Sequence, residues 1–188
     1  MIPTKIILGS KSPRRQELVM HLTYPVEIRV QDVDETYPSD LKLEAIPEFL
    51  AILKAKVLQD KLEEGELLLT SDTIVLLDNE VIGKPKDEND AINMLKKLSG
   101  RTHLVISGVA LTSTSKQDSF RCETKVTFRE LTPGEIEKYV REYKPLDKAG
   151  AYGIQEWIGY IGVTAIQGSY LNVVGLPLAN VHTAIENF

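Results

Sequence analysis

Three basic residues at the start of a predicted helix could bind an anion. Lys11, Arg14 and Arg15 directly follow an apolar strand that we predict over residues 5–8. Ser12 and the proline after it favour a helix that begins there, because serine caps helix N-termini and proline fits the first turn. A helix start already carries free N–H groups and partial positive charge, so basic side chains do not stabilise it. Their presence indicates a phosphate site.

The two arginines of this helix are expected to face different ways. Arg14 lies four residues before Leu18, on the side that we predict to be buried, whereas Arg15 lies toward the edge of that side. An arginine on a buried side needs a partner for its charge. The alternative is a helix whose arginines only face solvent, and short motifs of this kind also arise by chance.

A carboxylate, Asp72, interrupts an apolar strand that we predict over residues 67–77. Burying a charged group costs free energy unless it is paired or bound to a metal. Asp72 could therefore hold Mg²⁺ or accept a proton from water. The acidic loop with Asp34 and Glu35 could supply a second carboxylate. The alternatives are that Asp72 lies in a surface bulge and that the acidic loop is only solvated.

Two lysines are placed where they could add positive charge to such a site. Lys54 follows Leu50 by four positions, so it borders the buried side of a helix predicted over residues 43–61. Lys84 lies between a glycine and a proline, directly after a predicted strand. Each lysine alone fits an ordinary surface charge, whereas both beside the arginine loop would grip a triphosphate.

A loop rich in glycine and alanine, residues 144–155, is too long for a simple connector. Its small residues permit close approach between the backbone and a ligand. Gln155 at its end has both hydrogen-bond donors and an acceptor, which suits the edge of a nucleotide base. A tight turn that is packed for its shape is the alternative.

Composition excludes several classes of protein. The formal net charge of −5 does not suit a general nucleic-acid binder, and no stretch has the roughly 20 apolar residues of a membrane span. Cys122 is the single cysteine, so an intrachain disulfide is impossible and a reducing compartment fits. The N-terminal segment shows no signal-peptide pattern, and we expect a cytoplasmic protein. The histidines show no zinc-like spacing.

Strands and helices alternate along the chain, which predicts an α/β protein. Its 188 residues are enough for one domain or for two tightly joined lobes. We predict strands over residues 5–8, 26–30, 67–77, 80–82, 103–114, 120–128 and 163–167. We predict helices over residues 13–22, 43–61, 88–98, 133–143 and 178–187, and loops over 144–155 and 168–177.

Taken in order, these segments resemble the Maf family of nucleoside triphosphate pyrophosphatases over nearly the whole chain. The resemblance rests on the segments 10–15, 34–35, 54–55, 71–73, 83–85, 98–100, 147–150 and 172–177. The stretch 149–155 is similar to the family branch that acts on dTTP and UTP, and the branch for methylated GTP usually differs there. Lys11 stands where relatives usually carry a small residue, and its added positive charge could tighten triphosphate binding.

The resemblance implies hydrolysis between the α and β phosphates, which yields a nucleoside monophosphate and pyrophosphate. It implies a two-lobed α/β fold like that of Maf proteins and inosine triphosphate pyrophosphatases, with a central mixed β-sheet flanked by helices and a cleft between the lobes. It further implies a single domain over residues 1–188, a divalent metal (Mg²⁺ or Mn²⁺) and a homodimer. The charge and composition lead us to expect no nucleic-acid or membrane partner.

The resemblance also assigns roles to particular residues. Asp72 matches the proton acceptor of the family and, with Glu35, would hold the metal. Arg14, Thr73 and Gln155 match its specificity positions. The positions that handle phosphate and metal are matched by Ser10, Arg15, Glu35, Lys54 and Lys84. The family has also been linked to cell-division arrest, so one alternative is a regulator that senses nucleotides without hydrolysing them. The other is a phosphatase that releases inorganic phosphate.

Overall fold

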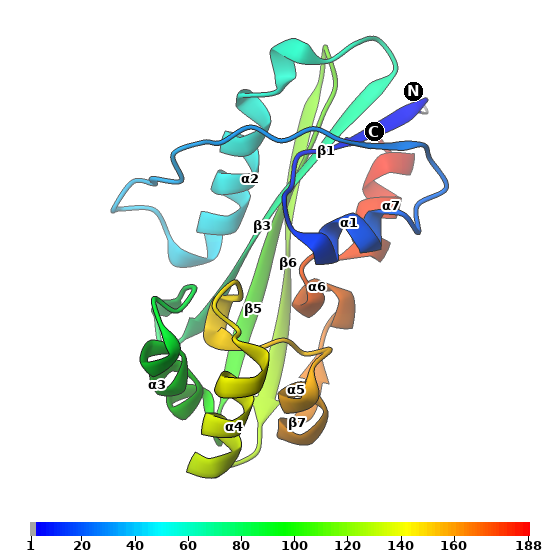
Figure 1. Ribbon diagram of the computed structural model, residues 1–188. Helices are drawn as coiled ribbons and strands as arrows, with labels where there is room; N and C mark the ends of the chain where they lie inside the picture. Colours follow the sequence, from blue (N-terminus) through cyan, green and yellow to red (C-terminus); the bar gives the residue numbers. More distant parts are fainter. Residues whose placement is uncertain (1–2) are drawn as a thin grey trace. The chain divides into compact units, whose positions relative to one another are not determined.

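The computed structural model describes residues 3–188, and Figure 1 shows their helices and strands. Residues 1–2, part of the N-terminal segment without a signal-peptide pattern, lie outside the described residues. The strands are β1 (Lys5–Leu8), β2 (Val26–Ile28), β3 (Glu66–Leu77), β4 (Glu80–Ile82), β5 (Thr102–Thr112), β6 (Gln117–Phe128) and β7 (Val163–Gln167). The α-helices are α1 (Pro13–Val19), α2 (Ile46–Lys56), α3 (Glu88–Leu98), α4 (Pro133–Tyr143), α5 (Trp157–Gly162), α6 (Tyr170–Val174) and α7 (Leu178–Glu186). Short 3₁₀ turns are η1 (Leu43–Ala45), η2 (Gln59–Lys61) and η3 (Ala149–Ala151).

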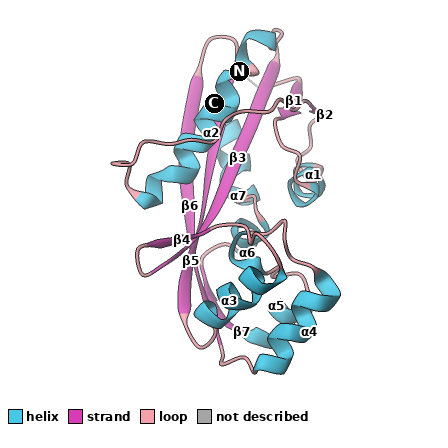
Figure 2. Cartoon of the chain, turned by 60° about the vertical axis from the view of Figure 1, so that its left-hand side comes forward, coloured by secondary structure: helices cyan, strands magenta, loops and turns pink. Residues whose placement is uncertain are grey.

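The strands form a mixed sheet in the order β2-β1-β3-β5-β6-β7, and β4 pairs with β3 (Figure 2). The chain divides into two compact units. The first unit comprises Met1–Asp72, Ser107–Cys122 and Gly175–Phe188, and the second comprises Thr73–Ile106 and Glu123–Val174. Strands β3, β5 and β6 contribute residues to both. The predicted α/β class and mixed sheet are confirmed, whereas the single domain and the cleft stay predictions.

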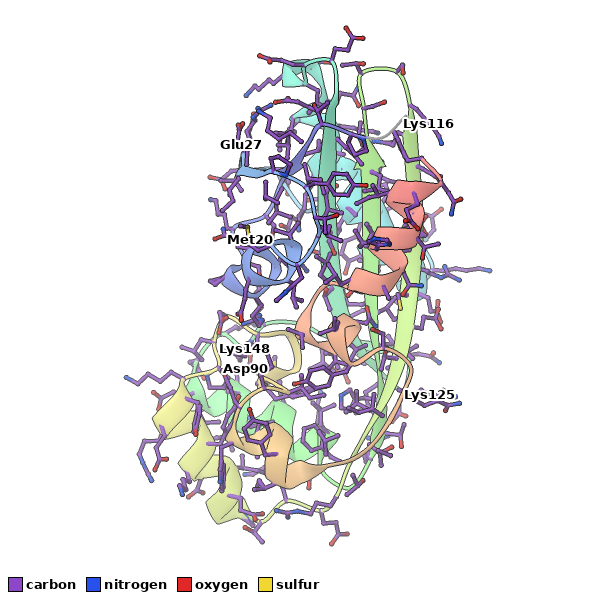
Figure 3. The ribbon with its side chains drawn as sticks, turned by 90° about the vertical axis from the view of Figure 1, so that its right-hand side faces the viewer. Met20, Glu27, Asp90, Lys116, Lys125 and Lys148 are labelled. Carbon is purple, nitrogen blue, oxygen red and sulfur yellow. The ribbon has the colours of Figure 1, made fainter. Side chains whose placement is uncertain are left out.

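A network of charged side chains joins β1, β2 and β3 in the first unit. The Glu66 side chain is 3% exposed, and its two oxygens accept hydrogen bonds from Arg29 at 3.0 and 3.1 Å. Lys5 Nζ lies 2.9 Å from both Glu66 Oε1 and Glu27 Oε2; Glu27 is labelled in Figure 3. The Arg29 hydrogen bonds are the chief cause that lowers the pKa of Glu66 to about 2. The network thus ties the start of β3 to its neighbours.

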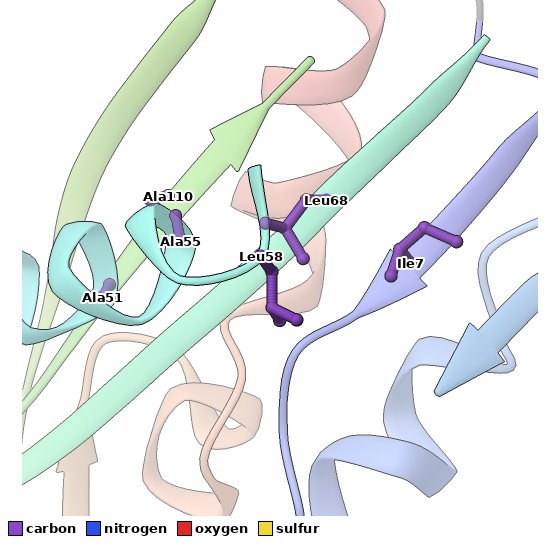
Figure 4. Close-up of a cluster of buried hydrophobic side chains, with 6 residues drawn as sticks. All are labelled: Ile7, Ala51, Ala55, Leu58, Leu68 and Ala110. Atoms are coloured by element: carbon purple, nitrogen blue, oxygen red, sulfur yellow. The ribbon is translucent and has the colours of Figure 1, made fainter. Parts of the chain in front are cut away.

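Helix α2 packs closely on the strands of the first unit. Six buried side chains form one cluster there (Figure 4): Ile7, Ala51, Ala55, Leu58, Leu68 and Ala110. The close approach also depends on Gly108 of β5, because a Cβ at that position would lie 2.1 Å from the Glu48 backbone nitrogen. This packing fixes the height of α2 above the sheet, and α2 carries Lys54.

The single long helix predicted over residues 43–61 is wrong. The observed helix α2 begins at residue 46 and ends at residue 56, between the 3₁₀ turns η1 and η2. Pro47 lies in the first turn of α2, which is where a helix tolerates its missing N–H, so it sets the start. The short helices α5 and α6 lie where no helix was predicted, because six and five residues show too little of a helical period.

The second unit contains a hairpin, a strand pair and three packed helices. Strand β3 turns back into β4 through Asp78 and Asn79, whose φ angles of 49° and 62° match the predicted turn. Strand β7 pairs antiparallel with β6, and α4 packs on both α3 and α5. Helix α4 begins with a capping box between Thr132 and Glu135, so the predicted Thr132 cap is confirmed. Within residues 3–188, no helix has the length and apolar character to cross a bilayer.

Candidate active site

The loop after β1 is held close to β3 and leads into α1. A Cβ at Gly9 would lie 2.7 Å from Thr70 Cγ2, so a glycine is needed there. Ser10 is 7% exposed, and its hydroxyl accepts a hydrogen bond from the Ser12 N–H at 3.3 Å. The Ser12 hydroxyl accepts from the Arg15 N–H at 3.5 Å, which confirms the predicted cap of α1. This loop therefore brings Ser10 and the first turn of α1 to the end of β1.

Backbone carbonyls fix the guanidinium of Arg15. Its Nε donates to the Gly175 carbonyl at 2.8 Å, and its Nη1 donates to the Ser71 carbonyl at 2.8 Å. The same Nη1 donates to the Ser10 hydroxyl at 3.5 Å. Carbonyl and hydroxyl oxygens carry no formal charge, so these bonds orient the guanidinium without neutralising it. Arg15 is thus a fixed positive charge at the end of β1.

Nearby charged groups shift the pKa of Arg15 in opposite directions. Burial lowers the pKa of Arg15, Asp72 raises it, Arg14 lowers it and Glu35 raises it. Both arginines are half-buried. Arg15 was predicted to lie toward the edge of the helix's buried side, and its contacts with the loop were not predicted. Helical side chains lean toward the N-terminus, so a residue in the first turn reaches back over the preceding loop.

Lys54, Asp72 and Glu35 form an ionic cluster in the first unit, which we call the lysine–carboxylate cluster. Lys54 Nζ lies 2.5 Å from Asp72 Oδ1 and 3.0 Å from Glu35 Oε1. The side chains of Lys54 and Asp72 are 16% and 14% exposed, and that of Glu35 is 54% exposed. The Thr70 hydroxyl donates to the Ala51 carbonyl at 2.7 Å, which holds this part of β3 against α2. The structure therefore brings these three predicted residues together.

The carboxylates of this cluster fit a divalent cation. One cationic group, the Lys54 ammonium, already lies within 3.0 Å of oxygens from both Asp72 and Glu35. Within residues 3–188, no group of three or more His, Cys, Asp or Glu side chains is placed to hold a metal. Mg²⁺ typically takes one or two protein carboxylates and completes its shell with water and substrate phosphates. Asp72 and Glu35 match that number of carboxylates, and they would be the residues that hold such an ion.

The other predicted residues lie in the second unit. Thr73 follows Asp72 within β3 and is half-buried, whereas Lys84 and Gln155 are exposed. The Gly150 N–H donates to the Gly83 carbonyl at 3.0 Å, which ties the glycine-rich loop to the residue before Lys84. The second unit thus brings the loop of Gln155 and the segment of Lys84 together at that bond.

Several residues around these positions were not predicted to contribute. The Ser71 and Gly175 carbonyls orient Arg15, and Tyr139, Lys148 and Glu156 surround the turn of Gln155. Gly175 and Lys148 lie within motif segments that the sequence analysis quoted, which was the available signal for them. Carbonyls leave no mark in a sequence, because every residue has one.

Known proteins are similar to this chain along nearly its whole length. The family model described as Maf-like protein matches residues 5–188. The chain belongs to the Maf family. A dTTP/UTP pyrophosphatase of Phocaeicola vulgatus is 52% identical over 183 residues, which cover 97% of this chain and 95% of that protein. A dTTP/UTP pyrophosphatase of Bacteroides thetaiotaomicron is 49% identical over 183 residues, with 97% and 95% covered. The predicted resemblance to the Maf family is confirmed.

A solved structure extends the comparison to the fold. The Staphylococcus aureus Ham1 protein matches this Maf protein with a TM-score of 0.54, over 96% of this chain and 99% of that one. The two sequences are 14% identical, so the likeness concerns the fold alone.

Proposed function

We propose that this Maf protein hydrolyses dTTP and UTP between the α and β phosphates, giving the nucleoside monophosphate and pyrophosphate. The observation that carries this proposal is the lysine–carboxylate cluster of Lys54, Asp72 and Glu35, with the fixed charge of Arg15 nearby. Relatives about half identical along nearly the whole chain bear the name dTTP/UTP pyrophosphatase, which supports the choice of substrates.

The positive groups are proposed to hold the triphosphate. Arg15 is already oriented by two carbonyls, so it need not reorganise when an anion binds. Lys54 would exchange its carboxylate partners for phosphate oxygens, which accept hydrogen bonds from an ammonium equally well. Arg14 and Ser10 would add contacts from the loop after β1, and Lys84 would add a further positive charge.

Asp72 is proposed to accept the proton of the attacking water at Oδ1. That oxygen is engaged by Lys54 alone among the contacts described above, so it becomes available when Lys54 turns to phosphate. Asp72 and Glu35 would hold Mg²⁺ or Mn²⁺, which when bound supplies positive charge to the phosphate oxygens and acidifies its water. Hydrolysis of a phosphoanhydride bond depends mainly on positioning and charge stabilisation, which these side chains would provide.

Thr73 and Gln155 are proposed to select the pyrimidine base. The Gln155 amide carries donors and an acceptor, so it can pair with the edge of a uracil or thymine ring. A site built to pair with particular polar groups rejects a base that leaves them unpaired. The exposure of Gln155 in the second unit leaves its amide open to a ligand.

We propose further that the protein acts on free nucleotides in the cytoplasm, as a homodimer. The formal net charge of −5 disfavours binding to the nucleic-acid backbone, and a single cysteine fits a reducing compartment. Analytical ultracentrifugation of the purified chain tests the dimer, and a monomer at assay concentration would contradict it.

A panel of nucleotides with product analysis tests the proposed function. The purified protein is assayed with Mg²⁺ or Mn²⁺ on dTTP, UTP, dCTP and GTP, and the products are separated by ion-exchange chromatography. We expect thymidine or uridine monophosphate and pyrophosphate, with dTTP and UTP preferred. Release of inorganic phosphate would identify a phosphatase instead. Binding of dTTP without any product would identify the nucleotide sensor, and a preference for GTP would overturn the choice of base.

A further inference from the structure

Gln155 lies in a tight turn of the second unit, residues 153–156. The Glu156 N–H donates to the Gly153 carbonyl at 3.0 Å, which closes the turn. Ile154 is 5% exposed and points into the unit, whereas Gln155 is exposed. The turn therefore presents the Gln155 amide outward while its neighbours are anchored inside.

A buried hydroxyl holds both ends of this turn. Tyr139 of α4 is fully buried, and its hydroxyl accepts a hydrogen bond from the Gly153 N–H at 3.0 Å. The same hydroxyl donates to Glu156 Oε2. Burial, followed by the hydrogen bond to Glu156, raises the pKa of Tyr139, so its hydroxyl stays protonated and remains a donor. One side chain thus fixes the first and the last residue of the turn.

The Glu156 side chain folds back across the turn. Its Oε1 lies 3.1 Å from Nζ of Lys148, whose side chain is 12% exposed and is labelled in Figure 3. A Cβ at Gly153 would lie 2.7 Å from Glu156 Cδ, so a side chain at Gly153 would displace the carboxylate. On the other side, a Cβ at Gly159 of α5 would lie 2.1 Å from the Ile154 carbonyl oxygen. The turn is therefore packed against the Glu156 side chain on one side and against α5 on the other.

We infer that Tyr139, with Glu156 and Lys148, is a positioning group for Gln155 and thereby sets the selectivity for the base. The inference rests on the proposed function. An amide that reads a base edge must be held within about 0.5 Å of its productive position. The turn backbone cannot supply that alone, because a four-residue turn has one internal hydrogen bond. The Tyr139 hydroxyl adds one bond at each end, directly on the two residues that flank Ile154 and Gln155.

The test removes the Tyr139 hydroxyl and measures selectivity. Tyr139→Phe keeps the ring and deletes both hydrogen bonds. We expect KM for dTTP and UTP to rise about tenfold, as for the loss of the one proposed hydrogen bond between Gln155 and the base, with kcat changed less than about twofold. The ratio of kcat/KM for dTTP over dCTP falls by a similar factor, because dCTP differs at the ring edge that Gln155 would read.

Tyr152→Phe is the matched control. Tyr152 is 6% exposed and lies in the same loop, but its hydroxyl bonds to His103 Nε2 at 2.7 Å and not to the turn. This change also removes a buried hydrogen bond, so it lowers the unfolding midpoint. We expect it to leave the ratio of dTTP to dCTP within about twofold of the unaltered protein.

A double-mutant cycle separates positioning from a general loss of structure. Gln155→Ala should lower selectivity about as much as Tyr139→Phe, and Tyr139→Phe should add nothing in the Gln155→Ala background. Should Tyr139→Phe fail to fold, Glu156→Gln keeps the bond from Tyr139 and weakens the pair with Lys148, and a smaller loss of selectivity is expected. Unchanged selectivity in Tyr139→Phe beside a loss in Gln155→Ala, or additive losses, overturns the inference alone. Unchanged selectivity in Gln155→Ala overturns the proposed role of Gln155 and this inference with it. Absence of turnover by the unaltered chain overturns the proposed function and this inference with it.

Discussion

Two carboxylates on the same strand, β3, are both largely buried, yet their partners differ. Glu66 is 3% exposed and is engaged by Arg29 at both oxygens, by Lys5 and by the Glu63 N–H. Asp72 is 14% exposed, and the described ion pair engages one of its oxygens with the flexible Lys54. A carboxylate with every acceptor position filled stabilises a fold. One that is held by a single flexible ammonium can exchange that partner for a ligand.

Apart from replacement of Asp72 itself, the largest effect is expected where Lys54 is replaced. Lys54→Met keeps the length of the side chain and removes the charge shared by Asp72 and Glu35. We expect turnover of dTTP to fall roughly 300-fold, as for the loss of one preorganised charged donor. Steady-state kinetics measure this, with circular dichroism to verify folding. Lys56→Met is the control, because Lys56 lies on the same helix and is exposed. Equal losses in both variants would contradict a specific role for Lys54.

The Glu66 network is expected to affect stability and not chemistry. Glu66→Gln leaves the charges of Arg29 and Lys5 without their shared buried partner, which we expect to cost about 3 kcal/mol in the free energy of unfolding. Urea denaturation measures the loss. Turnover by the folded fraction should stay within about twofold, and the exposed neighbour variant Glu64→Gln should show neither change. A large loss of turnover in Glu66→Gln would contradict the view that Glu66 serves stability while Asp72 serves the reaction.

Acid should lower the free energy of unfolding by protonating Glu66. The pKa of Glu66 is lowered from 4.5 to about 2 in the folded chain, so this carboxylate stabilises the fold above about pH 4.5. This stabilisation is lost as pH falls from about 4.5 through about 2. Its contribution to the free energy of unfolding is about 3 kcal/mol, because a difference of one in pKa corresponds to about 1.4 kcal/mol. Unfolding curves measured across that range should converge for the unaltered protein and Glu66→Gln. Parallel curves would contradict the linkage.

The smallest effect is expected for Lys11. Its Nζ lies 2.6 Å from Asp32 Oδ1, but the two side chains are 66% and 91% exposed. Such pairs are screened by water and salt. Lys11→Ala should raise KM for dTTP less than about threefold at low salt, and high salt should abolish the difference. A larger rise that persists at high salt would show that Lys11 contacts the substrate directly.

Features that depend on neighbours in the chain could be predicted from the sequence. The cap at Ser12, the capping box at Thr132 and the turn at Asp78 and Asn79 each involve residues within a few positions of one another. The placement of Asp72 was predictable for a related reason, because apolar residues on both sides bury the strand that carries it. These local constraints hold in whatever tertiary arrangement surrounds them.

Features that depend on tertiary contacts could not be predicted in the same way. The carbonyls of Ser71 and Gly175 that orient Arg15 belong to segments far apart in the chain. The acidic loop of Glu35 has no periodicity, so its contact with Lys54 follows from how the loop lies over α2. Tyr139 likewise has an ordinary position in a helix, and its role is visible only beside the turn at Gly153.

Substitution of Asp72 tests the central claim most directly. Asp72→Asn keeps the size of the side chain and removes its capacity to accept a proton at Oδ1. Turnover of dTTP is followed by pyrophosphate release, and dTTP binding is followed by calorimetry on the same preparation. We predict that binding stays within about threefold while turnover falls about a thousandfold, as for the loss of a general base. Near-normal pyrophosphate release from Asp72→Asn would contradict the account.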